Sequence, residues 1–139
     1  MTATKTPGTR NSASQARAAE ARAAELSDVV DAMTGLAGSV LAKTFQSGSK
    51  GFYSQSKVST SAGTYQSQVT ATLVGSKNDA KLRPSAGVAE VREVLSGSVR
   101  MLLGAHTFQS GKTGFYGQSR LMIGGQAYQV AMQAVLIVK

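Results

Sequence analysis

A fourteen-residue stretch occurs twice in this chain, and it constrains the fold more than any other feature. TFQSGSKGFYSQSK at residues 44–57 returns as TFQSGKTGFYGQSR at residues 107–120, an offset of 63. Extended without gaps, residues 44–76 align with residues 107–139, and 14 of the 33 positions are identical. Self-similarity at a fixed offset indicates two copies of one supersecondary unit.

The similarity continues upstream at a different offset. VVD at residues 29–31 resembles VAE at residues 88–90, an offset of 59, so the second copy is expected to hold four extra residues ahead of its TFQSG. Between the copies lies Pro84, and the residue before a proline favours extended backbone, which suits a linker. The sequence therefore predicts one domain made of two repeats and a linker, with boundaries at 26–77, 78–86 and 87–139.

Each copy begins with apolar residues at helical spacing and continues with apolar–polar alternation. Gly35, Gly38 and Gly97 are the expected helix stops. The pattern predicts an α+β fold built from a duplicated αβββ unit: two antiparallel β-meanders with helices packed on one face. The expected strands are residues 40–46, 52–60 and 64–74 in the first copy, and 99–109, 115–123 and 127–138 in the second.

The segment ahead of the repeats has a different composition. Residues 13–25 read ASQARAAEARAAE, and alanine and arginine are strong helix formers, so an alanine-rich helix is expected there. Residues 1–12 have no apolar anchor, and we expect them to form a disordered basic tail.

Composition excludes several classes of site. The chain has no cysteine, which removes disulfide frameworks and thiolate metal sites. His106 is the single histidine and has no second ligand or carboxylate at a useful spacing, so a surface cation is expected rather than a metal ligand or catalytic base. The SGSKG and SGKTG loops precede strands, so glycine-assisted hairpins are favoured over P-loops. We expect no enzyme, cofactor, metal or small-molecule substrate.

No apolar run reaches the roughly 18–20 residues of a membrane span, and the N-terminus has no apolar core typical of a secretory signal. These features predict a cytoplasmic protein without a membrane partner, with association with a nucleoid as a further option.

Charge is separated along the chain. Fifteen Lys and Arg face seven Asp and Glu, which gives a net charge of +8. All seven acids lie outside the expected strands, whereas residues 41–77 hold four lysines and residues 99–139 hold two arginines and two lysines. A surface of one sign attracts a polyanion and raises its association rate.

Alternation along the expected strands separates two faces. Phe52 and Phe115 fall on the apolar side, while Tyr53 and Tyr116 fall on the other side with glutamines and cations. Cationic sheets with exposed aromatic rings bind single-stranded nucleic acid by stacking bases and following phosphates. The candidate binding residues are Lys43, Lys50, Tyr53, Gln55, Lys57, Gln66, His106, Lys112, Tyr116, Gln118, Arg120 and Gln129. The alternative is that these are ordinary strand tyrosines with solubilising cations.

The leading hypothesis is a non-enzymatic protein that binds single-stranded nucleic acid, DNA in preference to RNA, as a homo-oligomer. One chain of this size buries a thin core, and unpaired outer strands are natural subunit contacts. A self-assembling structural protein (a coat, filament or nucleoid-packing subunit) is the rival hypothesis. It is favoured by the low charged fraction, the Ser, Thr, Gly, Gln and Ala content, and the long strands.

Overall fold

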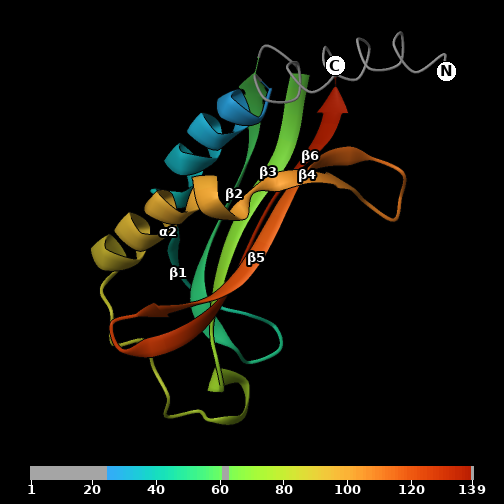
Figure 1. Ribbon diagram of the computed structural model, residues 1–139. Helices are drawn as coiled ribbons and strands as arrows, with labels where there is room; N and C mark the ends of the chain where they lie inside the picture. The colour runs from blue at the N-terminus through green and yellow to red at the C-terminus, as the bar shows by residue number, and fades with distance from the viewer. Residues whose placement is uncertain (1–24, 61–62, 139) are drawn as a thin grey trace, which may run out of the picture.

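The structure, a computed structural model, describes residues 25–60 and 63–138. Within these ranges it has two helices and a six-stranded antiparallel sheet, which confirms the mixed α+β class (Figure 1). The expected tail at 1–12 and nearly all of the expected alanine-rich helix at 13–25 lie outside the described residues. The first helix is described over residues 25–37 and is followed by β1 (Leu41–Thr44), β2 (Lys50–Thr60), β3 (Gly63–Leu73), the short 3₁₀ helix η1 (Ser76–Asn78), α2 (Val88–Leu102), β4 (Gly104–Thr107), β5 (Thr113–Ile123) and β6 (Gln126–Val138).

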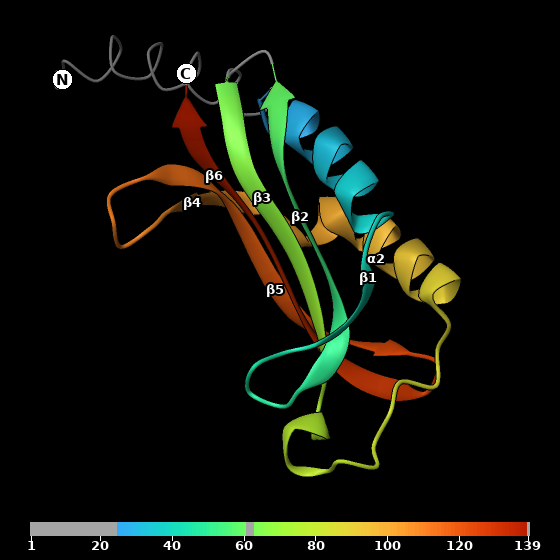
Figure 2. The same ribbon diagram turned by 180° about the vertical axis from the view of Figure 1, so that it is seen from behind.

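The strands form two meanders that meet in the middle of the sheet. The strand order is β1-β2-β3-β6-β5-β4, so β3 and β6 are central and the short strands β1 and β4 lie at the two edges. Every neighbouring pair is antiparallel. Figures 1 and 2 show the long strands β2, β3, β5 and β6 twisted together, with both helices beside them.

Both meanders have the same strand register. Leu41 pairs with Tyr53 between β1 and β2, and Gly104 pairs with Tyr116 between β4 and β5, which is the same pairing shifted by 63 residues. At the centre of the sheet, Val69 of β3 pairs with Met132 of β6, and these two positions are themselves 63 residues apart. The pairings of the two halves are therefore related by a twofold that passes through this central pair.

The hydrophobic core lies between one face of the sheet and the helices. Burial alternates residue by residue along β3, as it does where one side of a strand faces a core. The buried strand residues and the buried helical residues form one contiguous cluster. Its largest fully buried members are Met33, Tyr65, Leu95, Ile123, Tyr128 and Met132.

The second helix is longer than the sequence pattern predicts, and it runs through Gly97 to Leu102. The expected stop at Gly97 and the expected strand from Val99 are therefore wrong. Val91, Leu95 and Val99 are fully buried and four residues apart, so one helical stripe packs into the core. Burial of this stripe outweighs the roughly 1 kcal/mol that a glycine costs inside a helix. The first helix does end at residue 37, just before Gly38.

The buried helical stripes also correct the upstream alignment. Val29, Met33 and Ala37 of the first helix are fully buried, and the fully buried positions of α2 follow them at an offset of 62. The offset of 59 would instead place Val29 over Val88, which is 37% exposed. The four extra residues expected in the second copy are therefore not needed, because the helices keep nearly the same spacing from their strands as the rest of the chain.

Two matched core tyrosines have different surroundings. The hydroxyl of Tyr65 donates a hydrogen bond to Glu25 of the first helix. Burial, and then the bond to Glu25 and its negative charge, raise the pKa of Tyr65. Tyr128 is also fully buried, and its hydroxyl has no hydrogen-bond partner among the described residues. Burial, and then the charge of Glu90, raise the pKa of Tyr128.

Candidate nucleic-acid interface

The sheet face opposite the core is polar. Cross-strand partners share a face, so the register assigns each side chain to one side of the sheet. We call this side the polar face, and ten of the twelve candidate binding residues lie on it. They are Lys43, Tyr53, Gln55, Lys57, Gln66, His106, Tyr116, Gln118, Arg120 and Gln129.

Cations stand at both ends of the two outer rows of the polar face. One row crosses the sheet from Lys43 to Arg120 by way of Gly51, Thr72 and Gln129. The other outer row crosses from Lys57 to His106 by way of Gln66, Val135 and Gly114. Lys43, Lys57, His106 and Arg120 are all fixed by β-sheet register rather than by loops.

The two inner rows contain the tyrosines and most of the glutamines. In one inner row Tyr53 lies level with Gln118, and in the other Gln55 lies level with Tyr116. Gln68 and Gln133 pair across the centre. Three strand spacings, or about 14 Å, separate the strand of Tyr53 from the strand of Tyr116. The polar face therefore has a glutamine-bearing centre with a tyrosine on each side.

A first aromatic cluster consists of Lys43, Phe45 and Tyr53. The rings of Phe45 and Tyr53 meet edge to face, with centroids 6.3 Å apart and an interplanar angle of 89°. The Nζ atom of Lys43 lies 4.7 Å from the centroid of the Tyr53 ring and 5.9 Å from that of Phe45. These distances are within the range of a cation–π interaction.

A second aromatic cluster consists of His106, Phe108 and Tyr116, each 63 residues after its counterpart. Phe108 and Tyr116 again meet edge to face, at 6.5 Å and 89°. The ring of His106 lies 4.7 Å from Phe108 and 5.2 Å from Tyr116, in the place that Lys43 takes in the first cluster. The two clusters therefore share one geometry, with a lysine in one and an imidazole in the other.

The same side-chain hydrogen bond recurs in both strands. Tyr53 donates to Oε1 of Gln55 at 2.6 Å, and Tyr116 donates to Oε1 of Gln118 at 2.9 Å. Each tyrosine ring is half-buried and each of these glutamines is exposed. Because the glutamine oxygen accepts from the tyrosine, its amide hydrogens are directed to other acceptors.

Glycine-assisted hairpins hold the two clusters, as the sequence predicts. Gly48 and Gly111 have φ angles of 93° and 89°, in the left-handed region that favours glycine. The amide of Phe45 donates to Ser49 O at 2.8 Å, and the amide of Phe108 donates to Lys112 O at 2.8 Å. These turns place each phenylalanine directly after its edge strand.

Sequence reasoning missed Phe45 and Phe108 as members of the site. Each falls in the loop after an edge strand, where alternation gives no face. The repeat itself carried the signal, because both phenylalanines belong to the TFQSG motif and follow Lys43 and His106 by two residues.

The remaining two candidates, Lys50 and Lys112, lie apart from the polar face. The Nζ atom of Lys50 donates to the carbonyl oxygens of Ala80 at 2.8 Å, Leu82 at 2.7 Å and Asp79 at 3.4 Å. Lys50 therefore ties the linker to β2. Lys112 is exposed in the turn before β5.

The strands hold no acid, while the described acids lie on the helices and the linker. Glu25, Asp28 and Asp31 belong to the first helix, and Glu90 and Glu93 belong to α2. Asp79 follows η1. The polar face therefore combines cations, aromatic rings and amides without a carboxylate of its own.

No group of three or more His, Asp or Glu side chains within the described ranges is arranged to hold a metal ion. Neither helix, over the part of the chain that the structure describes, is long and apolar enough to cross a membrane. No protein-family model matches the chain, and comparison with curated proteins and with solved structures finds no match.

Proposed function

We propose that this protein binds single-stranded nucleic acid, DNA in preference to RNA, on the polar face of its sheet and without catalysis. The observation that carries the proposal is the pair of aromatic clusters, which have the same geometry on one face that bears cations and no acid. Bases stack on Tyr53 and Tyr116, and each stacked base contributes roughly 1–3 kcal/mol with little sequence preference.

The cations and amides of the face have distinct roles in this proposal. Lys43, Lys57 and Arg120 neutralise phosphates as the strand crosses the sheet. Lys43 also interacts with the Tyr53 ring, and its charge makes the adjacent surface attractive to an anion. The glutamines at the centre donate amide hydrogens to base edges and sugars.

We further propose that the fold is a duplicated αβββ unit whose two helices cover the same face of the sheet. The equal register of the two meanders and the matched aromatic clusters support this proposal. Duplication explains why two stacking sites occur in one chain. A strand that spans both sites gains from both of them without a second binding event.

The proposal is tested by fluorescence anisotropy with a labelled oligo-dT strand, and with the matching duplex as a control. Tight binding of the single strand and weak binding of the duplex support it. Equal binding of both would show that charge alone attracts nucleic acid, and no binding would remove the proposal.

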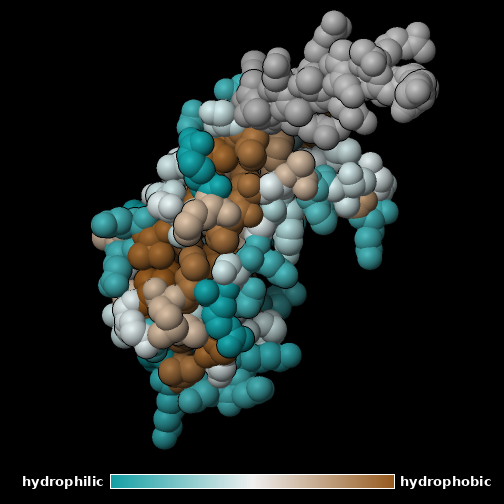
Figure 3. All heavy atoms as spheres, viewed as in Figure 1, coloured by the Kyte–Doolittle hydropathy of each residue, from teal (hydrophilic) through white to brown (hydrophobic). Residues whose placement is uncertain are grey.

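A second candidate function is self-assembly, and exposed apolar side chains favour it. Leu41, Met101 and Met122 are 62%, 77% and 65% exposed. In the view of Figure 1, hydrophobic side chains gather in a band over the helices (Figure 3). Size-exclusion chromatography with and without oligo-dT separates the two functions, because a polymer that forms without nucleic acid supports assembly, whereas a defined oligomer that takes up the strand supports binding.

A further inference from the structure

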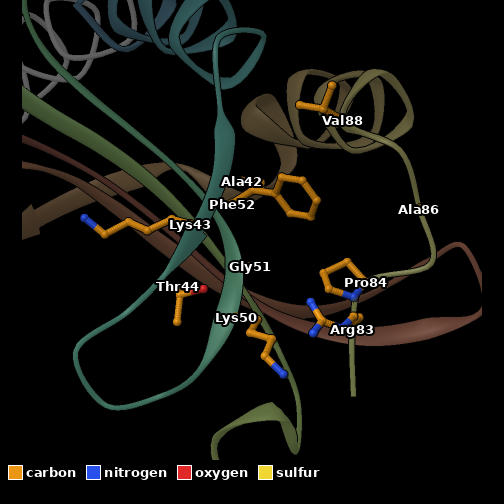
Figure 4. A pocket seen from close by; sticks show the side chains of 10 residues that line it. All are labelled: Ala42, Lys43, Thr44, Lys50, Gly51, Phe52, Arg83, Pro84, Ala86 and Val88. Atoms are coloured by element: carbon orange, nitrogen blue, oxygen red, sulfur yellow. The ribbon is translucent and has the colours of Figure 1, made fainter. Parts of the chain in front are cut away.

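A cleft lies on the far side of edge strand β1 from the polar face. It has a volume of about 460 Å³ and separates the β1–β2 hairpin from the segment that leads into α2 (Figure 4). Phe52 and Val88 line one end, and Arg83 and Pro84 form the opposite wall. Its size falls within the range of small-ligand sites, which are also concave and mostly apolar with a few polar groups.

Hydrogen bonds fix the wall that carries Arg83. Lys50 donates to the carbonyl oxygen of Leu82, the residue before Arg83, at 2.7 Å. On the other side, Nε2 of Gln126 donates to the carbonyl oxygen of Arg83 at 3.0 Å, and Oε1 of Gln126 accepts from the amide of Ser85 at 2.7 Å. Lys50 and Gln126 are therefore positioning residues for Arg83.

The charge of the cleft is positive. Its lining includes Lys43, Lys50 and Arg83 and contains no carboxylate. Figure 4 shows the Arg83 side chain directed across the cleft toward the hairpin, and the Lys43 side chain leading away from it. Lys43 thus belongs both to the wall of the cleft and to the first aromatic cluster, which makes β1 the boundary between the two surfaces.

The other half of the molecule has a matched cleft of opposite character. It measures about 380 Å³, and Ala105, Thr107 and Phe115 line it at the positions that correspond to Ala42, Thr44 and Phe52. Its other lining residues include Glu25 and Tyr65 in place of Arg83 and Pro84. A carboxylate repels phosphate, so only the first cleft suits an anionic ligand.

We infer that the cleft beside β1 binds one nucleotide of a strand that continues round this edge from the polar face. This inference rests on the proposed function. The base lies against Pro84 and Val88 with Phe52 at the end of the cleft, and Arg83 binds the phosphate, since its planar fork matches phosphate oxygens. The asymmetry of the two clefts means that the strand wraps round one edge of the sheet only.

The first experiment compares Arg83→Gln with Arg100→Gln by anisotropy on a series of oligo-dT strands from about four to about sixteen nucleotides. Arg100 is exposed at the other end of α2, about 18 Å along the helix from Val88, so its loss removes the same charge. Loss of Arg83 should lower the affinity for long strands about tenfold, the size of a charge-assisted hydrogen bond, and leave short strands unaffected. Equal curves for the two variants at every length would overturn the inference.

The second experiment locates the strand directly, because the chain has no cysteine of its own. Val88→Cys places a thiol in the cleft, and Met101→Cys places one at the far end of α2. An oligo-dT strand with a terminal maleimide should crosslink to the first variant much faster than to the second. Equal crosslinking rates would contradict the inference, even if both variants fold and bind.

The two levels of the proposal fail separately. A wild-type protein that binds no oligo-dT removes the proposed function and the cleft together. A wild-type protein that binds oligo-dT through Tyr53 and Tyr116, while Arg83→Gln behaves like Arg100→Gln, keeps the function and removes only the cleft.

Discussion

The hydroxyl of Tyr116 donates a hydrogen bond of 2.9 Å to Oε1 of Gln118, two residues further along β5. Residues two apart in a strand share a face, so the bond holds the ring along the strand and leaves the amide hydrogens of the glutamine for another acceptor. The same bond links Tyr53 and Gln55 in β2. A ring and a donor group fixed in this relation form one unit for binding a base, and the sheet carries two such units.

Replacing both tyrosines by alanine should weaken single-strand binding by about 2–6 kcal/mol if the stacking contributions of two bases add. Both rings are on the polar face, so the thermal melting temperature should change little. The phenylalanine double variant keeps the rings and should keep most of the affinity. Anisotropy on oligo-dT measures all three proteins.

The neighbouring phenylalanines provide the control for this pair. Phe52 and Phe115 are 3% and 4% exposed and belong to the core, so alanine at either position should cost about 3–5 kcal/mol of stability. A tyrosine double variant that binds oligo-dT as the wild type does would rule out stacking and favour self-assembly.

Salt should weaken binding in proportion to the phosphates that the polar face neutralises. Three full cations, Lys43, Lys57 and Arg120, predict a slope of about −2 in a plot of log affinity against log salt, at roughly −0.7 per phosphate. The Lys57→Gln and Arg120→Gln double variant should make this slope shallower by about 1.4.

A matched loss of charge elsewhere tests whether the effect is local. Lys77 and Arg100 are exposed and lie in η1 and α2, away from the strands. Their double glutamine variant should leave the slope nearly unchanged. Equal changes in both double variants would show that net charge, and not the polar face, determines the affinity.

Lys50 should matter for stability more than an ordinary surface lysine. Its Nζ atom donates to three linker carbonyls, and a hydrogen bond to a charged group contributes about 1.5–3 kcal/mol. Lys50→Met should therefore lower the free energy of unfolding by about 2–3 kcal/mol in urea titrations. Lys57→Met, in the same strand but exposed, should change it by less than about 0.5 kcal/mol. Equal effects would mean that the linker does not depend on this lysine.

Much of the sheet could be predicted from the sequence because its signals are local. Alternation and turn glycines predicted the long strands β2, β3, β5 and β6 to within about two residues of their observed bounds. The same alternation assigned Tyr53 and Tyr116 to the face opposite Phe52 and Phe115.

The rest depends on contacts that leave no mark in the local pattern. The role of Lys50 depends on carbonyls about thirty residues away, and any residue type presents a carbonyl. The rows of the polar face depend on β3 pairing with β6, which neither strand specifies alone. The true end of α2 depends on Val99 finding a place in the core, which outweighs the glycine two residues earlier.

Gly97 offers a test of where α2 ends. It lies inside the helix, and a Cβ atom at this position would meet no atom within 4 Å. Gly97→Ala should therefore raise the free energy of unfolding by up to about 1 kcal/mol, since alanine favours the helix. A helix that stopped at this glycine would lose stability instead. Gly114→Ala is the contrasting variant, because its Cβ would lie 1.9 Å from the carbonyl oxygen of Ala134, and it should lower stability severely.

The two buried tyrosines should respond to the loss of their hydroxyls in opposite ways. Tyr65→Phe removes the hydrogen bond to Glu25 and should cost about 1–2 kcal/mol at pH 8. Tyr128→Phe removes a buried hydroxyl with no partner among the described residues, so it should be neutral or stabilise by up to about 1 kcal/mol. Urea titrations of the two variants beside the wild type measure both effects.

Alkali should reveal the raised pKa of these tyrosines. In the unfolded chain a tyrosine loses its proton near pH 10, whereas in the folded protein burial keeps the proton on Tyr65 to higher pH. The unfolded state then binds fewer protons, so the stability that is fully present below about pH 10 falls as the pH rises through the raised pKa. Tyr65→Phe removes this contribution, so its free energy of unfolding should fall less steeply than that of the wild type between pH 9 and about pH 11. If both proteins lose stability with the same slope, Tyr65 does not retain its proton in the folded state, and the burial argument for this residue is wrong.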